Sequence, residues 1–221
     1  MTDITRLDES QLDAIISLHH DVIADADPTL VASETDAFFK DHLADCGKTF
    51  GIIQNGSLLA YCVLGLPRPK DPNFGTDQGI ADADLPLVAH IDGVAVRAEC
   101  RGHNLQQILT RHRMNEAIKA GRTLALTTVA PGNTASLINI LSCGLLVRGL
   151  KEKYGGQRFL MRADLTKTHC RYSQEDVQEW CLATDIECCH RLLDAGLVGA
   201  TYRKVPDRNS VEIGWLPDHC I

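Results

Sequence analysis

The segment of the chain with the clearest chemistry is residues 94–106, where an apolar strand end of the form Val-x-Val is followed by a short basic loop and a helix start. Backbone N–H groups at the start of a helix point at anions, and an adjacent arginine adds positive charge. The order of these residues predicts a diphosphate site, although a purely structural turn would have the same pattern. The candidate anion-binding residues are those of the loop and the helix start, namely Arg101, Gly102, His103, Asn104, Leu105 and Gln106.

Charge is unevenly distributed along the 221 residues, whose formal net charge is −7. Residues 1–50 carry eleven acids against three Lys or Arg, whereas residues 97–122 carry six Lys or Arg against two acids. A general nucleic-acid binder needs a basic face, so the overall acidity argues against a nucleic-acid partner. The local basic excess favours an anion site within an acidic protein.

Hydrophobic periodicity predicts the elements that position this segment. In chain order they are helices over 11–26 and 33–44, a β-hairpin over 50–64 that turns at Asn55-Gly56, a loop over 66–86, a strand over 85–96, a helix over 104–120, a strand over 124–129, a helix over 133–142, and strands over 145–151 and 158–165. This order predicts a mixed α/β (α+β) layer fold, with a central mixed sheet flanked by helices.

The chain changes character after residue 165. Capping-box patterns that begin at Ser173 and Thr184 predict two short helices, and residues 197–203 and 211–216 predict a terminal hairpin. We therefore expect two units, a domain over 1–165 and a C-terminal helix–hairpin extension over 166–221.

Residues 94–106 resemble the GNAT superfamily of acyl-CoA-dependent N-acyltransferases, whose signature is Arg/Gln-x-x-Gly-x-Gly/Ala after a strand ending in Val-x-Val. A second stretch is also similar to the family. It consists of Asn133-Thr-Ala-Ser136 opening a helix, Gly144 at the end of that helix, and residues 152–160. The resemblance runs from the first helix to about residue 165. It implies a GNAT-like acyltransferase domain in which strands 87–96 and 124–129 splay apart to form a cleft.

Several positions depart from the family pattern. Asn104 stands where the family has its middle glycine, and Gln106 where it has Gly or Ala. Asn is the residue other than Gly that best tolerates a left-handed backbone, so we expect the turn to survive. Ile140 stands where many members carry a tyrosine that protonates the departing thiolate. Tyr154, a water or no acid at all would replace that tyrosine.

The resemblance implies a place for acetyl-CoA as co-substrate. The backbone of Val94, Ala95 and Val96 would pair with the pantetheine arm, and residues 101–106 would bind the pyrophosphate. Asn133 and Ser136 would border the thioester. Asn133 can equally be a helix cap, and the two valines can equally be core residues.

His90 is the candidate general base. His90 and Asp92 lie on the same face of the predicted strand, because side chains alternate along a strand. Some GNAT members place a catalytic glutamate six residues before the strand end, at the position of His90. An imidazole has an unperturbed pKa of about 6.5, and Asp92 would raise its basicity if the two side chains meet. Asp92 itself is the alternative base.

The leading hypothesis is an N-acetyltransferase that moves an acetyl group from acetyl-CoA to a small-molecule or peptide amine by direct attack in a ternary complex. One alternative is a noncatalytic acyl-CoA-binding or sensing module. Another is a zinc-stapled interaction protein, based on the Cys and His residues near the C-terminus. We expect no metal, because none of their pairs has the usual Cys-x₂₋₄-Cys spacing. These residues are His169, Cys170, Cys181, Cys188, Cys189, His190, His219 and Cys220.

The cellular compartment is predicted from cysteines and apolar stretches. Nine cysteines at irregular spacings predict reduced thiols rather than a disulfide framework. The longest apolar stretch, residues 57–67, is shorter than the roughly 20 residues of a membrane-spanning helix. The first ten residues contain acids where a signal peptide has a positive region. We expect a cytoplasmic protein without a membrane partner.

Overall fold

The computed structural model describes residues 3–24, 26–167, 172, 174–206 and 210–218. The elements are β1 (Thr5–Arg6), η1 (Glu9–Gln11), α1 (Leu12–Ala24), α2 (Asp36–Leu43), β2 (Gly47–Gln54), β3 (Ser57–Gly65), α3 (Phe74–Asp77), η2 (Leu85–Leu87), β4 (Val88–Val96), η3 (Ala98–Cys100), α4 (Leu105–Lys119), β5 (Leu124–Val129), α5 (Thr134–Leu141), β6 (Leu146–Lys153), β7 (Gly156–Asp164), η4 (Gln174–Asp176), β8 (Glu179–Leu182), α6 (Ile186–Asp194), β9 (Leu197–Lys204) and β10 (Val211–Pro217). The strands form one ten-stranded sheet in the order β1-β2-β3-β4-β5-β7-β6-β9-β10-β8. The predicted mixed α/β architecture is confirmed.

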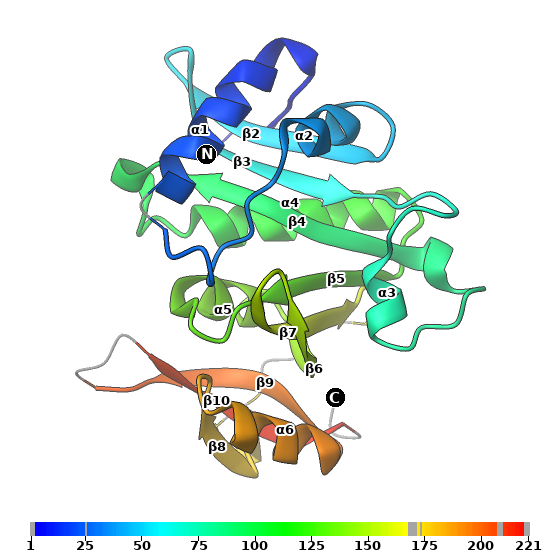
Figure 1. Ribbon diagram of the computed structural model, residues 1–221, viewed down its shortest axis with the longest axis vertical. Coiled ribbons are helices and arrows are strands. Elements are labelled where there is room, and N and C mark those ends of the chain that lie inside the picture. The colour runs from blue at the N-terminus through cyan, green and yellow to red at the C-terminus, as the bar shows by residue number, and fades with distance from the viewer. Residues whose placement is uncertain (1–2, 25, 168–171, 173, 207–209, 219–221) are drawn as a thin grey trace.

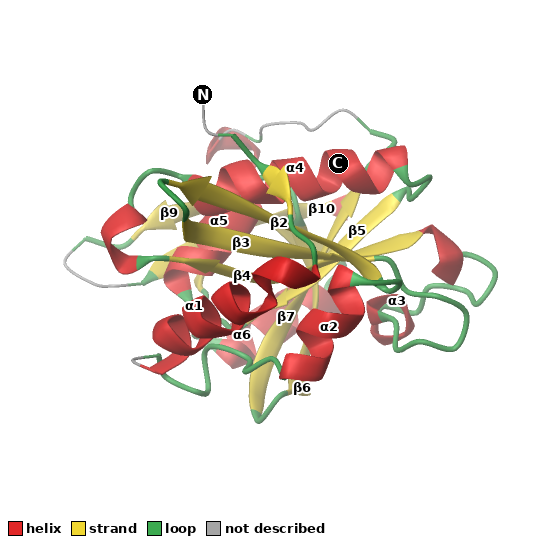
Figure 2. Cartoon of the chain, turned by 90° about the horizontal axis from the view of Figure 1, so that it is seen from above, coloured by secondary structure: helices red, strands yellow, loops and turns green. Residues whose placement is uncertain are grey.

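Helices cover both faces of this sheet. Figure 2 shows α1 and α2 on one side of β2, β3 and β4, with α4 on the other side. The apolar residues divide accordingly. Ile15, Leu18 and Phe39 pack with one cluster of buried strand residues, whereas Leu109 and Leu137 pack with another. The amphipathic periodicity of the sequence therefore corresponds to a layered fold.

The strands β4 and β5 form a short parallel pair and then separate. Their pairing runs from Val88↔Leu124 to His90↔Leu126 and ends there. On its other edge, β4 stays paired with β3 as far as Val96. The predicted splay of strands 87–96 and 124–129 is therefore confirmed, and it leaves one edge of β4 facing an opening in the sheet.

A β-bulge shapes β4 at the point of separation. Cys62 pairs with Val94 and Leu64 pairs with Ile91, so two residues of β4, Asp92 and Gly93, lie opposite the single residue Val63. A bulge of this kind bends a strand and changes the direction of its side chains. The bulge places Asp92 at the opening.

The chain between β3 and β4 is more structured than predicted. The expected loop over 66–86 contains the short helix α3, whose N-cap Asn73 accepts a hydrogen bond from the Gly75 N–H. The strand predicted over 85–96 begins three residues late, because Pro86 lies in the 3₁₀ turn η2. Both differences lie on the α3 side of the opening between β4 and β5.

The C-terminal segment adds to the same sheet (Figure 1). The predicted hairpin is confirmed as β9 and β10, and the second predicted helix as α6. The first predicted helix is wrong, because the chain forms only the 3₁₀ turn η4 and then the strand β8. Ser173 lies outside the described residues.

The junction between β6 and β9 is narrow. It consists of the pair Val147↔Gly199, and a Cβ on Gly199 would lie 3.0 Å from the Val147 Cβ and 2.7 Å from the Ile213 Cγ2. Trp215 of β10 and Phe159 of β7 belong to one buried cluster. The boundary at residue 165 stays a prediction.

None of the described helices combines the length and apolarity that crossing a membrane requires.

Candidate active site

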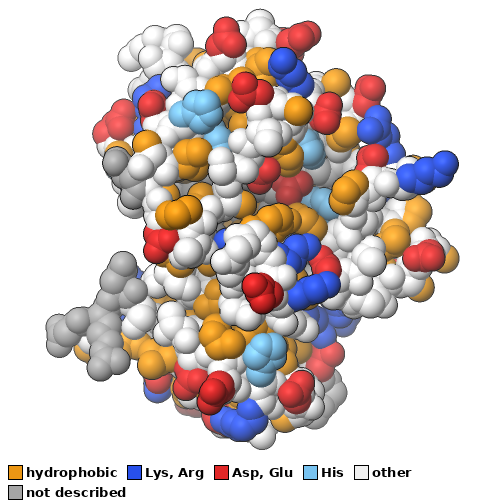
Figure 3. Space-filling view, viewed as in Figure 1, with side chains coloured by type: hydrophobic (Ala, Val, Ile, Leu, Met, Phe, Trp, Pro, Cys, Tyr) orange, Lys and Arg blue, Asp and Glu red, His pale blue; other side chains and the backbone are white. Residues whose placement is uncertain are grey.

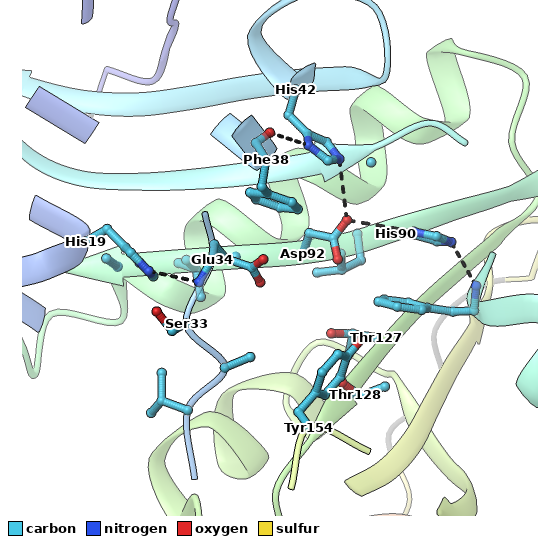
Figure 4. Close-up of a pocket in the computed structure, with 18 of the residues that line it drawn as sticks. His19, Ser33, Glu34, Phe38, His42, His90, Asp92, Thr127, Thr128 and Tyr154 are labelled. Carbon is cyan, nitrogen blue, oxygen red and sulfur yellow. Dashed lines mark hydrogen bonds and ion pairs between the residues drawn. The ribbon is translucent and has the colours of Figure 1, made fainter. Parts of the chain in front are cut away.

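A cavity of about 640 Å³ opens where β4 and β5 separate. Asp92 of β4 and Thr127 of β5 lie on opposite sides of it, with Tyr154 from the β6–β7 turn and Glu34 from the α1–α2 connection completing the wall (Figure 4). Figure 3 shows the hollow from outside, with acidic, histidine and apolar side chains around it.

Asp92 is the most buried carboxylate of this cavity, with 11% of its side chain exposed. Its Oδ2 lies 3.9 Å from the His42 Nε2 and 3.8 Å from the His90 Nδ1. Burial, together with the negative charge of Glu34, raises the pKa of Asp92 to about 7. Gly65 leaves room for this carboxylate, because a Cβ there would lie 2.5 Å from Oδ2. Asp92 is therefore a carboxylate that changes charge near neutral pH.

The buried guanidinium of Arg113 fixes the backbone that carries Asp92. The Arg113 Nη1 donates to the Asp92 carbonyl at 2.6 Å and to the Val63 carbonyl at 3.2 Å, across the β-bulge. Nη2 donates to the Thr110 Oγ1 at 3.0 Å. Sequence analysis missed this role of Arg113, because a helix pattern does not show which strand its charged residue will face.

His90 is held as a neutral hydrogen-bond acceptor. Its Nε2 accepts the Phe74 N–H at 3.1 Å, and its ring stacks on Phe74 with centroids 4.1 Å apart. The imidazole proton is therefore on Nδ1, which faces Asp92. Burial and the neighbouring His42 lower the pKa of His90 to about 3. The expectation that Asp92 raises the basicity of His90 is wrong, because desolvation outweighs the attraction of a carboxylate that is itself largely desolvated.

His42 of α2 contributes a second imidazole that sequence analysis missed. Its Nδ1 donates to the Phe38 carbonyl at 2.8 Å, so in the neutral ring the lone pair of Nε2 faces Asp92. Burial lowers the pKa of His42. Two imidazoles with low proton affinity thus flank a carboxyl with high proton affinity.

Glu34 brings a second carboxylate into the cavity (Figure 4). Its backbone N–H donates to the His19 Nε2 at 3.1 Å, and the His19 Nδ1 then lies 2.9 Å from the Tyr61 hydroxyl. These bonds fix the backbone at Glu34 to the buried face of α1. Burial raises the pKa of the Glu34 carboxyl. The sequence did not single out Glu34, because it is one of eleven acidic residues within residues 1–50.

Tyr154 sits at the tip of the β6–β7 turn with a left-handed φ of 54°, and 51% of the residue is exposed. Burial is the main cause that raises the pKa of its phenol, and the negative charges of Asp92 and Glu34 raise it further. The phenol therefore stays protonated and can donate its O–H. The adjacent Lys153 forms an ion pair with Asp77 of α3. This pair holds the turn beside α3.

The predicted anion turn has the expected backbone. Asn104 has a left-handed φ of 58° and Gly102 a φ of 82°, so Asn replaces the family's glycine without loss of the turn. The Ile108 N–H donates to the Asn104 carbonyl at 3.0 Å, which leaves the N–H groups of residues 105–107 at the open end of α4. Arg101 is exposed beside them.

Polar side chains connect the starts of α4 and α5. The Gln106 Nε2 donates to the Ser136 Oγ at 3.2 Å. Asn133 caps α5 by accepting the Ser136 N–H at 3.1 Å, and its Nδ2 donates to the Leu30 carbonyl at 3.3 Å. The helix-cap interpretation of Asn133 is therefore confirmed, and both ends of its amide are occupied.

The predicted site residues divide into two groups in space. One group lines the cavity, namely His90, Asp92, Val94, Ala95, Gln106, Asn133, Ser136 and Tyr154. The others do not line it and belong to the end of β4, the turn before α4 or the first residue of α4, namely Val96, Arg101, Gly102, His103, Asn104 and Leu105. Ile140 is buried against the cavity and supplies only hydrocarbon there.

The C-terminal Cys and His residues are partly described. Cys181, Asp185 and Cys188 offer ligand atoms that lie within 4.8 Å of one another. The Cys181 Sγ lies 4.0 Å from the Cys189 Sγ, and both thiols contact the Leu182 carbonyl, at 3.4 and 3.7 Å. The predicted absence of metal stays a prediction. Outside the described residues lie His169, Cys170, His219 and Cys220.

No protein-family model matches the sequence, and no curated protein matches it. Solved structures do match. An N-acetyltransferase from Staphylococcus aureus is 20% identical with a TM-score of 0.55, over 74% of this chain and 98% of that chain. An acetyltransferase of the GNAT family from Streptococcus pneumoniae is 13% identical with a TM-score of 0.58, over 73% of this chain and 98% of that chain. The chain has the GNAT fold.

A third GNAT-fold neighbour has been solved with its cofactor. It is yncA from Salmonella typhimurium, which contains acetyl-CoA and is 18% identical, with a TM-score of 0.57 over 78% of this chain and 98% of that chain. This chain therefore spans nearly the whole length of each of these neighbours. The GNAT fold agrees with the two features predicted from the sequence, the splayed strands and the turn before α4.

Proposed function

We propose that this chain is an acyl-CoA-dependent N-acetyltransferase that transfers an acetyl group from acetyl-CoA to an amine by direct attack in a ternary complex. The observation that carries the proposal is the position of Asp92. It is a carboxylate with a pKa of about 7, placed by a β-bulge at the opening between β4 and β5. A group that accepts protons near neutral pH suits the deprotonation of an amine.

The acetyl-CoA site has two parts in this proposal. Residues 101–106 bind the pyrophosphate through the open N–H groups of α4 and the Arg101 guanidinium. The β5-facing edge of β4 at Val94, Ala95 and Val96 pairs with the pantetheine arm, because β5 has already diverged from it. Ser136 and Asn133, which line the cavity at the start of α5, border the thioester in this proposal.

The transfer step needs one proton acceptor and one proton donor. Ionised Asp92 takes a proton from the acceptor ammonium, directly or through a water. The nitrogen lone pair then attacks the thioester carbonyl carbon to give a tetrahedral intermediate. The C–S bond breaks with its electron pair going to sulfur, and Tyr154 donates a proton to the leaving thiolate, in place of the tyrosine that Ile140 replaces. The nitrogen loses its second proton to water as the amide forms, and Tyr154 regains a proton from solvent. His90 and His42 position and shield Asp92 rather than titrate in its place.

The test is CoA release and amide formation with a panel of primary amines, followed by mass spectrometry of the amine product. We expect turnover with at least one amine and a sequential kinetic pattern. We also expect Tyr154→Phe to lower kcat roughly tenfold or more while the Kd for CoA is retained. Binding of CoA without product from any amine would support a noncatalytic module instead. Accumulation of acetylated protein in the absence of amine would contradict direct attack.

A further inference from the structure

The cavity carries more negative than positive charge that is free to meet a ligand. Asp92 and Glu34 lie inside it, and Asp41 lines it from α2. Of the two arginines that line it, Arg68 is already paired with Asp71 at 3.0 Å. Arg113 is turned toward backbone carbonyls. The arginines of the wall are therefore occupied, whereas the carboxylates of Asp92 and Glu34 lie at the cavity (Figure 4).

Glu34 is a partly buried carboxylate of this cavity whose side chain lacks a partner among the described residues. Within the described ranges, its side chain has no ion pair and no hydrogen bond, although it is partly buried. A partly buried carboxylate without a partner is costly for the fold, and burial raises its pKa in keeping with that cost. Its backbone N–H is bonded to His19, so the residue is held in place rather than free to swing into solvent. Such an arrangement is typical of a group that meets its partner in a ligand.

Hydrocarbon lines the same side of the cavity as Glu34. Val22 and Ile23 of α1, Leu30 and Val31 of the α1–α2 connection, and Phe38 of α2 all face it. Aliphatic carbon between two charged ends can pack on this wall. The cavity of about 640 Å³ also includes the residues assigned to the cofactor, so an aliphatic chain would lie along the part lined by α1 and the α1–α2 connection.

From these features we infer that the acceptor is an aliphatic diamine, in which one amine reacts at Asp92 and a second, ammonium end binds Glu34. This inference rests on the proposed function and names the substrate class of the same site. A monoamine would leave Glu34 unpaired, so the second positive charge is the feature that the site selects. The aliphatic segment contacts the apolar wall.

The test compares two probes of the same chain length, hexylamine and hexamethylenediamine. Their binding is measured by calorimetry in the presence of CoA, and their acetylation by product mass spectrometry with acetyl-CoA. We expect the diamine to bind at least about tenfold more tightly than the monoamine, because charge-assisted hydrogen bonds are among the stronger polar contacts. A purely apolar wall would give the opposite order, since hexylamine has the longer uncharged tail.

Glu34→Gln is the decisive variant, because it keeps the shape and removes the charge. We expect it to weaken diamine binding about tenfold while hexylamine binding changes less than about twofold. Asp36→Asn is the matched control, since it removes an exposed acid of α2 that does not line the cavity. The thermal midpoint of each variant reports whether it folds.

The possible outcomes separate this inference from the proposed function. Equal binding of the two probes to the unaltered protein, or equal losses for both probes in Glu34→Gln, would overturn the diamine assignment. Selective diamine binding without any acetylated product would leave the role of Glu34 intact and overturn the transferase proposal. Acetylation of both probes with equal kcat/KM would support the transferase proposal and overturn the role of Glu34 in selecting a diamine.

Discussion

Arg158 of β7 donates a hydrogen bond from Nη1 to the Thr29 carbonyl at 2.7 Å, across 129 residues of sequence. Its side chain is almost completely buried, and Asn133 makes a similar bond to the Leu30 carbonyl. Two elements from the far side of the opening thus hold the α1–α2 connection in place. Because Glu34 belongs to this connection, the acceptor wall depends on β7 and α5 as well as on α1 and α2.

The first prediction concerns Arg158→Met, which removes this bond and keeps an apolar stem. We expect the acceptor KM to rise roughly 3- to 10-fold, because one hydrogen bond contributes about 0.5–1.5 kcal/mol. The Kd for CoA should change less than about twofold, since the turn before α4 is untouched. Steady-state kinetics with the acetylated amine and calorimetry with CoA measure the two quantities. An unchanged KM would show that the connection is held by other contacts.

The second prediction concerns the base. Because Asp92 has a pKa of about 7 and must be ionised to accept a proton, kcat/KM should rise with pH and level off above about pH 7. Asp92→Asn should lower kcat roughly 10²- to 10⁴-fold and abolish this acidic limb. His90→Gln is the control, because it should retain the limb near pH 7. A limb that disappears in His90→Gln and persists in Asp92→Asn would assign the base to His90.

The third prediction follows from the same ionisation and concerns stability. The folded-state pKa of Asp92 is about 7, above the value of about 3.9 in an unfolded chain. Asp92 therefore contributes stability only while it is protonated, and this contribution is lost as pH rises from about 4 to about 7. The unfolding free energy of Asp92→Asn minus that of the original protein should therefore increase by more than about 1 kcal/mol from about pH 5 to about pH 8. Urea titrations at both pH values measure it, with the exposed Asp13→Asn as control.

The fourth prediction addresses the anion turn. Arg101→Glu places a like charge against the pyrophosphate and should weaken CoA binding at least about tenfold, since a charge-assisted hydrogen bond contributes about 1.5–3 kcal/mol. Calorimetry with CoA measures the effect, and the exposed Arg6→Glu on β1 controls for the change in net charge. Equal affinities of the two variants would remove residues 101–106 from the CoA site.

The fifth prediction concerns metal. Cys181 and Cys189 are buried and contact backbone carbonyls, so we expect the purified protein to contain no stoichiometric zinc after dialysis. Elemental analysis tests this expectation. Bound zinc that is lost in Cys181→Ser would instead identify Cys181, Asp185 and Cys188 as its ligands.

The sequence predicted those features that depend on local backbone rules. The left-handed Asn104, the cap at Asn133 and the turn at Asn55-Gly56 are set by neighbouring residues, and all three are present. His42 and Glu34 were missed, because their relation to Asp92 is created by the packing of α2 and its preceding connection against β4. The basicity of His90 was predicted with the wrong sign for a similar reason. Phe74, 16 residues earlier, covers the ring and occupies Nε2.

The order of strands in the sheet has a consequence for how the chain is made. From β1 to β5, each new strand pairs with the one synthesised just before it, and β9 and β10 do the same. Short sequence separations between partners favour rapid pairing, and a growing chain presents its strands in this order to a ribosome exit. Two strands are made before a partner exists. The strand β6 waits for β7, which joins it to β5, and β8 waits for β10. Until β7 is made, β6 has no sheet edge to join, so its backbone groups stay unpaired on the growing chain, and the same holds for β8 until β10 follows.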